Sequence, residues 1–134
     1  MKKTLLPSGW IKPRGYANGV AVRGTQVYIA GQIGWDEQAR FVSKEFGAQA
    51  AQALRNIVAV LREAGGRPEH IVRMTWYVTD KRAYLAAARE IGAAFRELIG
   101  DYDIAMSAVQ VVALIEDEAK VEIEATAVIP HEAH

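Results

Sequence analysis

The chain contains no cysteine. This absence excludes disulfide bonds, thiol nucleophiles and thiolate metal sites together, and it suits a reducing compartment. Long apolar runs are missing as well: MKKTLLPSGW has only Leu5 and Leu6 before Pro7, and no stretch approaches the roughly 20 apolar residues of a membrane span. We therefore expect a cytoplasmic protein with no signal peptide and no membrane partner.

Charge of one sign is also lacking, because 16 basic residues balance 16 acidic ones. Such a chain has no electrostatic drive toward nucleic acid, so we expect no nucleic-acid partner. Hydrophobic residues form 51% and charged residues 24% of the 134 residues, which excludes disorder and fits one domain over residues 1–134. High apolar content at zero net charge indicates that a partner covers part of the surface.

Sequence motifs for nucleotides, metals and serine nucleophiles are missing. There is no Walker loop, no GxGxxG and no GxSxG elbow. The three histidines are His70, His131 and His134, and their spacing does not gather three metal ligands. We therefore expect no metal and no cofactor, with His131 and His134 in a frayed tail.

Runs rich in β-branched and aromatic residues predict five strands. These strands span residues 16–22, 26–30, 70–79, 105–114 and 120–129. The first two flank a glycine turn at residues 23–25, which predicts a β-hairpin. Residues 1–15 contain two prolines and two glycines, and we expect an irregular arm there.

Two amphipathic helices are predicted between these strands, because apolar residues recur at intervals of three and four. One runs from Phe46 to Ala64 with Ser43 as its N-cap, and the other follows the capping residue Asp80 and ends at Gly100. The order ββαβαββ predicts an α+β fold with two helices on one face of a mixed sheet. Strands apolar on both faces, such as AVQVVAL, predict that a closed homo-oligomer covers the other face.

Paired carboxylates are the main chemical feature. Glu122 and Glu124 stand two residues apart in a predicted strand, so they project to the same face about 6.5 Å apart. If that face is open to solvent, they are solubilising. If it lines a cleft between subunits, one of them could orient or deprotonate a water, and partial burial would make it a better base.

Two tryptophans, Trp10 and Trp35, fall in predicted loops. Large aromatic side chains in loops often anchor a ligand or a partner chain. Of these alternatives, the sequence favours a subunit contact over a ligand contact.

Five segments together resemble the Rid family, also called YjgF or L-PSP endoribonuclease. These segments are GYANGV at 15–20, VYIAGQIG at 27–34, QALRNIVAVLREAGG at 52–66, HIVRMTWYVTD at 70–80 and VEIEATAV at 121–128. The resemblance implies a chorismate-mutase-like fold and a homotrimer whose three sheets pack into a barrel. It also implies three clefts between neighbouring subunits.

The resemblance further implies hydrolysis of enamines and imines to a 2-oxo acid and ammonia. Carried over by position, Glu122 matches the glutamate that handles a water. Tyr16 and Gly31 match the tyrosine and the backbone glycine of the substrate pocket.

Three positions depart from the family pattern. Met106 stands where active members have a carboxylate-binding arginine, Ala30 where a serine is common, and Ala88 where a polar residue is common. A thioether offers no charge-assisted grip on a carboxylate, so Met106 predicts a more apolar pocket and a bulkier substrate. Arg14 could supply a positive charge from another direction, although a solvated loop arginine is its simpler interpretation.

The sequence therefore supports two functions from different classes. One is a small-molecule imine or enamine hydrolase, with Glu122 as its catalytic residue. The other is a non-catalytic trimer that binds a small metabolite, the missing arginine marking lost chemistry. A ribonuclease, the historical label of the family, is disfavoured by the balanced charge.

Overall fold

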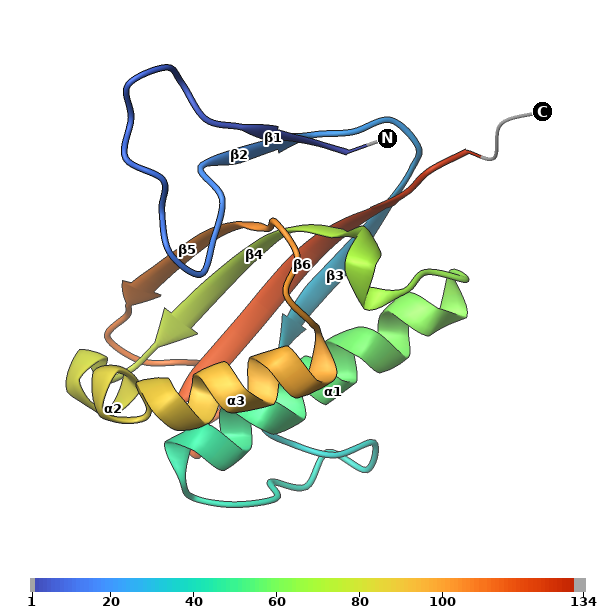
Figure 1. Ribbon diagram of the computed structural model, residues 1–134. Helices are drawn as coiled ribbons and strands as arrows, with labels where there is room; N and C mark the ends of the chain where they lie inside the picture. The colour runs from blue at the N-terminus through green and yellow to red at the C-terminus, as the bar shows by residue number, and fades with distance from the viewer. Residues whose placement is uncertain (1, 132–134) are drawn as a thin grey trace.

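The computed structural model describes residues 2–131, and its main feature is a four-stranded mixed sheet (Figure 1). The strands are β3 (Thr25–Gln32), β4 (Ile71–Val78), β5 (Ala105–Gln110) and β6 (Val121–Ile129). Their order in the sheet is β3-β6-β4-β5. Strand β6 is antiparallel to both of its neighbours, whereas β4 and β5 are parallel.

All helices cover one face of this sheet, as predicted (Figure 1). They are α1 (Phe46–Glu63), α2 (Lys81–Ala86) and α3 (Ala88–Leu98). The second predicted helix is thus divided in two at Ala87, where the backbone leaves helical geometry at φ −92° and ψ 8°. Its predicted cap is confirmed, because the Asp80 side chain accepts hydrogen bonds from the backbone N–H groups of Arg82 and Ala83.

The hydrophobic core lies between the helices and the sheet. Leu54, Ile57 and Leu61 of α1 are fully buried and pack with Met74 of β4 and Ile123 of β6. Burying one such side chain contributes about 1.5–3 kcal/mol. The periodic apolar stripe predicted from the sequence is therefore the surface that fixes α1 on the sheet.

The predicted hairpin is wrong. Strand β2 (Gly19–Ala21) pairs with β1 (Lys3–Leu5), while β3 pairs along its length with β6. The arm predicted to be irregular therefore contains a strand. The three residues of β2 offer few ladder hydrogen bonds, whereas the nine residues of β6 give β3 a full-length partner.

Two local predictions also need correction. The N-cap position of α1 is Glu45 rather than Ser43, whose hydroxyl instead accepts a hydrogen bond from the Glu45 backbone. The strand predicted over 105–114 ends at Gln110, after which Val111 N–H donates to the Val78 carbonyl. These differences leave the order of the elements unchanged.

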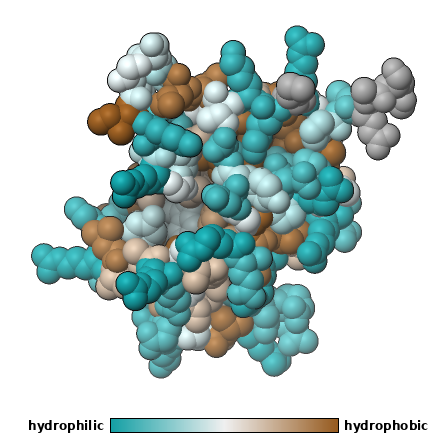
Figure 2. All heavy atoms as spheres, in the orientation of Figure 1, coloured by the Kyte–Doolittle hydropathy of each residue, from teal (hydrophilic) through white to brown (hydrophobic). Residues whose placement is uncertain are grey.

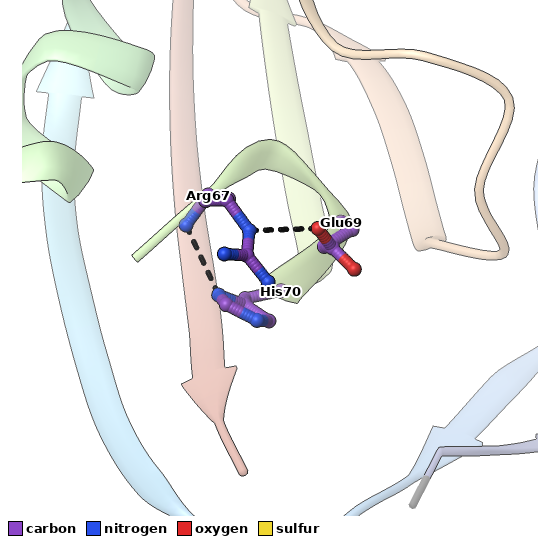
Figure 3. A network of polar contacts seen from close by, with 3 residues as sticks. All are labelled: Arg67, Glu69 and His70. Carbon is purple, nitrogen blue, oxygen red and sulfur yellow. Dashed lines mark hydrogen bonds and ion pairs between the residues drawn. The ribbon is translucent and has the colours of Figure 1, made fainter. Parts of the chain in front are cut away.

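His70 does not open a strand but closes a 3₁₀ turn, Pro68–His70 (Figure 3). The Arg67 backbone N–H donates to Nδ1 of His70 at 3.0 Å, and the Arg67 side chain pairs with Glu69 at 2.8 Å. Both ion-pair partners are exposed, so the pair contributes little to stability. The network is local and lies in the turn that connects α1 to β4.

No helix among residues 2–131 covers the opposite face of the sheet (Figure 1). Along β4 and β6, half-buried or exposed residues alternate with fully buried ones, so Arg73, Thr75 and Tyr77 share this open face with Glu122 and Glu124. Within the part of the chain that the structure describes, no helix combines the length and the apolar character needed to cross a bilayer.

Candidate functional site

Glu122 on β6 lies against Gly31 on β3, on the open face of the sheet. Strand β3 is irregular here, because its register with β6 shifts between Ile29 and Gln32. A Cβ atom on Gly31 would lie 2.6 Å from Cδ of Glu122, closer than real Cβ contacts come. Gly31 is therefore needed so that the carboxylate can approach the backbone, and not because of an unusual φ.

Glu124 points to the same face but has a different partner. The Tyr77 hydroxyl donates a 2.5 Å hydrogen bond to Oε1 of Glu124. This hydrogen bond, reinforced by burial and by the charges of Glu124 and Glu122, raises the pKa of Tyr77. No donor among residues 2–131 hydrogen-bonds the Glu122 carboxylate, so Glu122 is the glutamate left available to a water or a ligand.

A cavity of about 410 Å³ opens on this face, and Glu124 lines it whereas Glu122 does not. Its walls include Ala30 of β3, Arg73 and Thr75 of β4, and Glu124 of β6. Two of the residues predicted for the site, Ala30 and Glu124, therefore meet here. The guanidinium of Arg73 gives this open-face cavity a positive charge that the sequence analysis did not identify.

A second cavity, of about 520 Å³, lies on the helix side of the sheet, and we call it the helix-face cavity. Met106 of β5 and Ala88 of α3 line it together with the aromatic rings of Trp76, Tyr84 and Phe95. In Figure 2 the surface recedes between the N-terminal arm and the α2–α3 layer, where the cavity opens. Met106 thus has apolar neighbours, as the sequence predicts.

The sheet separates these two groups of predicted site residues. Met106 is paired with Met74, which is fully buried beneath the helices. Glu122 is paired with Tyr77, whose hydroxyl reaches Glu124 on the open face. One chain therefore cannot bring Met106 and Glu122 into the same pocket, and a site containing both needs two copies of the chain.

The N-terminal arm carries Tyr16 and Arg14. Tyr16 is 45% exposed and lines a third cavity, of about 310 Å³, with Leu5 and Asp103. The next residue, Ala17, donates its N–H to the Ile104 carbonyl at 2.8 Å, so the arm runs beside the start of β5. Arg14 is exposed on the same arm. Neither residue lines the open-face or the helix-face cavity.

The two loop tryptophans also lie apart from these cavities. Trp10 is 61% exposed on the N-terminal arm, where Ile11 is exposed too. Trp35 packs on Phe41 with ring centroids 5.7 Å apart, and its carbonyl accepts a hydrogen bond from Asn56. Trp35 therefore holds its own loop together within the chain, and of the two tryptophans Trp10 presents the larger uncovered surface.

Sequence reasoning missed Tyr77, Arg73 and Arg96. The signal for the first two was the alternation in β4, which places Arg73 and Tyr77 on the same face as the glutamates. Arg96 belongs to no motif that marks it as a site residue, but it lines the helix-face cavity. His131 is exposed, and the predicted tail residue His134 lies outside the described residues.

Comparison with known proteins decides the family. The model of the family described as Endoribonuclease L-PSP matches residues 11–129. The chain belongs to the Rid (YjgF/L-PSP) family. Its relatives include a RutC family protein of Aquifex aeolicus, 30% identical over 96% of this chain and 99% of that protein. Another is the 2-iminobutanoate/2-iminopropanoate deaminase of Salmonella typhimurium, 35% identical over 84% and 86%.

Solved structures of Rid proteins have the same fold. The chain is similar to the Rid protein YyfB of Yersinia pestis, with a TM-score of 0.82 and 34% identity over 96% of this chain and 98% of that one. It is also similar to Escherichia coli TdcF with bound serine, with a TM-score of 0.69 and 32% identity over 90% and 91%. The predicted α+β fold of this family is thereby confirmed.

Proposed function

We propose that this chain is a single-domain Rid protein, residues 1–134, that hydrolyses a small imine or enamine in clefts between the copies of a homotrimer. The observation that carries the proposal is the approach of the Glu122 carboxylate to the backbone at Gly31. Relatives named 2-iminobutanoate/2-iminopropanoate deaminase, about 35% identical, support this reaction class.

The reaction needs a water and one proton acceptor. Glu122 takes a proton from the water as the oxygen attacks the imine carbon, and the C=N bond becomes a C–N single bond. Glu122 delivers this proton to the nitrogen, which gives an amino alcohol. It then takes the hydroxyl proton and passes it to the amino group, so that the C–N bond breaks and ammonia leaves as the C=O bond forms. The products are an oxo compound and ammonia, with Glu122 returned to its starting state.

The separation of the site residues supports an oligomer with shared clefts, and the trimer is the form that the family resemblance implies. One copy would contribute Glu122 and Gly31, and its neighbour would contribute the helix-face cavity with Met106 and Ala88. Exposed apolar residues on β5 and on the following loop, among them Val109, Val112 and Ile115, supply surface for such an interface. A closed ring of three copies repeats the same cleft three times.

The direct test measures ammonia and oxo-acid release from imines that an amino-acid oxidase generates in the same vessel. Replacing Glu122 by Gln keeps the size of the side chain and removes the base, so the rate should fall by about 10²-fold or more. Glu124→Gln is the matched control, because Glu124 already accepts from Tyr77, and it should keep most of the rate. Equal rates for wild type and Glu122→Gln would overturn the proposal.

A mixing experiment tests the shared cleft. Glu122→Gln removes one half of the site, and Ala88→Trp fills the other half, so each variant alone should be inactive. Refolded together, they should recover about a quarter of the wild-type rate, because one interface in four joins the two intact halves. No recovery in mixed oligomers, or a monomer by sedimentation, would contradict a shared site.

Binding without turnover is the second candidate function. Met106 favours it, because this thioether lines the helix-face cavity where active members of the family are expected to hold an arginine. A metabolite that stabilises the protein thermally and is recovered unchanged would support binding. Ammonia release that depends on Glu122 would exclude it.

A further inference from the structure

One cation lines the helix-face cavity. Arg96 reaches it from α3 with an exposed side chain. Among residues 2–131, the one ion pair within 4.0 Å joins Arg67 and Glu69, so Arg96 has no such partner in the described chain. Its guanidinium is therefore available to an anion that comes from outside the chain.

The position of the guanidinium is set by small residues. Ala88, Gly92 and Arg96 follow one another at intervals of four along α3, so they share one helix face. A Cβ atom on Gly92 would lie 3.3 Å from Nη1 of Arg96. The arginine side chain thus extends back along the helix over Gly92, and all three residues line the cavity.

The rest of the wall is mostly apolar and aromatic. Trp76, Tyr84, Ile91, Phe95 and Met106 are among its lining residues. A volume of about 520 Å³ lies within the range of roughly 300–1,000 Å³ that small-molecule sites have. A two- to four-carbon acid would leave most of this apolar surface uncovered, whereas a phenyl or indole group would cover it.

Trp76, which lines the cavity, carries a buried hydrogen-bond donor. The side chain is 2% exposed, and its Nε1 is buried without a hydrogen-bond partner among the described residues. A buried donor without a partner is unfavourable, since it loses its hydrogen bond to water. A ligand in this cavity would reach the nitrogen only after neighbouring side chains shift, because Nε1 has almost no accessible surface.

We propose that the helix-face cavity binds an aromatic carboxylic acid, with the carboxylate on Arg96 and the ring against Trp76, Phe95 and Met106. That this ligand is the substrate rests on the proposed function. The substrate class is then an imine or enamine of an arylalkyl acid. The anion is held from the helix, because strand β5 offers Met106 instead of a cation.

Asp101 also lines the cavity, so the sign of the charge must be tested directly. A site for an anion gains affinity, or keeps it, when Asp101→Asn removes a negative charge, and it loses affinity with Arg96→Gln. A site for an ammonium group would show the opposite pattern. The pair of variants therefore distinguishes the two ligand classes.

The experiment is calorimetric titration of the full-length protein with three stable probes: 3-phenylpropanoate, its uncharged amide and butanoate. We expect 3-phenylpropanoate to bind best, and Arg96→Gln to weaken it at least tenfold, as loss of a charge-assisted hydrogen bond does. Arg89→Gln is the matched control, because this exposed arginine of α3 does not line the cavity. Binding of the amide should be weak and equal in all variants.

The comparison of acid with amide separates binding from helix stability. Arg96 lies in the last turn of α3, where a cation also interacts favourably with the helix dipole. If Arg96 had a purely structural role, its replacement would weaken binding of the acid and of the amide alike. Equal affinity of wild type and Arg96→Gln for 3-phenylpropanoate, tighter binding of butanoate, or no binding of any probe would each overturn the inference.

Activity assays then separate this inference from the proposed function. Imines made by the oxidase from L-phenylalanine should be hydrolysed with a lower KM than those from L-alanine, and Arg96→Gln should raise that KM with little change in kcat. If the binding pattern appears but no imine is hydrolysed, the proposed function fails and the cavity inference stands. If short imines are hydrolysed through Glu122 while 3-phenylpropanoate does not bind, the cavity inference fails alone.

Discussion

The carboxylate of Glu122 lies over the α-carbon of Gly31, so a single methyl group at position 31 would displace it. We expect Gly31→Ala to lower the rate of imine hydrolysis by about tenfold or more, because a misplaced catalytic group loses its alignment with the reacting atoms. The displaced side chain is flexible and half-buried, so the thermal midpoint should change little. Steady-state kinetics and a melting curve check both statements.

A double-mutant cycle identifies the cause of that loss. If Gly31→Ala acts through Glu122, it should have no further effect in the Glu122→Gln background. If Gly31→Ala lowers the rate by the same factor in both backgrounds, Gly31 acts through something other than this carboxylate.

Tyr77 should titrate at higher pH than an ordinary tyrosine, because its hydrogen bond to the Glu124 carboxylate raises its pKa. A folded-state pKa above the unfolded value stabilises the fold below the unfolded pKa, and this contribution is lost as the pH rises through the folded pKa. At alkaline pH, the free energy of unfolding should therefore fall less steeply with rising pH in Tyr77→Phe than in wild type.

Absorbance at 295 nm between pH 8 and pH 12 measures this titration, since it reports tyrosinate. The difference between wild type and Tyr77→Phe isolates one of the five tyrosines. A difference curve centred at or below the ordinary tyrosine pKa of about 10 would contradict the hydrogen bond between Tyr77 and Glu124.

Much of this fold follows from the sequence for local reasons. The apolar stripe ending at Leu61, the cap at Asp80 and the alternation around Glu122 each depend on residues a few positions apart, and all three appear in the structure. The pairing of β2 with β1 could not be read this way, because it depends on which strand competes better for β3.

The candidate site shows the same limit. That Glu122 and Glu124 share a face follows from the two-residue period of a strand, but which of them is engaged depends on Tyr77, 47 positions from Glu124. The spacing of Arg96 along its helix gives no hint of the cavity beside it. Residue spacing predicts faces, whereas partners across the fold have to be observed.

Gly92→Ala should stabilise the protein while disturbing the helix-face cavity. Alanine in a helix interior is favoured over glycine by roughly 0.5–1 kcal/mol. The added methyl group would lie 3.3 Å from Nη1 of Arg96, so the end of a flexible side chain has to move by a few tenths of an ångström. We expect a higher thermal midpoint with weaker binding of 3-phenylpropanoate; a lower midpoint would show that the guanidinium cannot yield.

Gln49 ties the start of α1 to the segment that leads into β6, and hence to Glu122. It is fully buried: its Nε2 donates to the carbonyls of Ser43 and Glu118 at 3.0 Å, and its Oε1 accepts from the Lys120 N–H at 2.8 Å. Replacing it by Leu would leave these backbone groups without partners, at about 1–3 kcal/mol for each buried group.

We therefore expect Gln49→Leu to lower the free energy of unfolding by about 2–5 kcal/mol, measured by urea denaturation. Gln52→Leu is the matched control on the same helix, because half-buried Gln52 donates only to Asn56 within α1 and should cost less than about 1 kcal/mol. The larger loss must come from the contacts between α1 and the segment before β6. Equal losses in the two variants would show that Gln49 acts only within its helix.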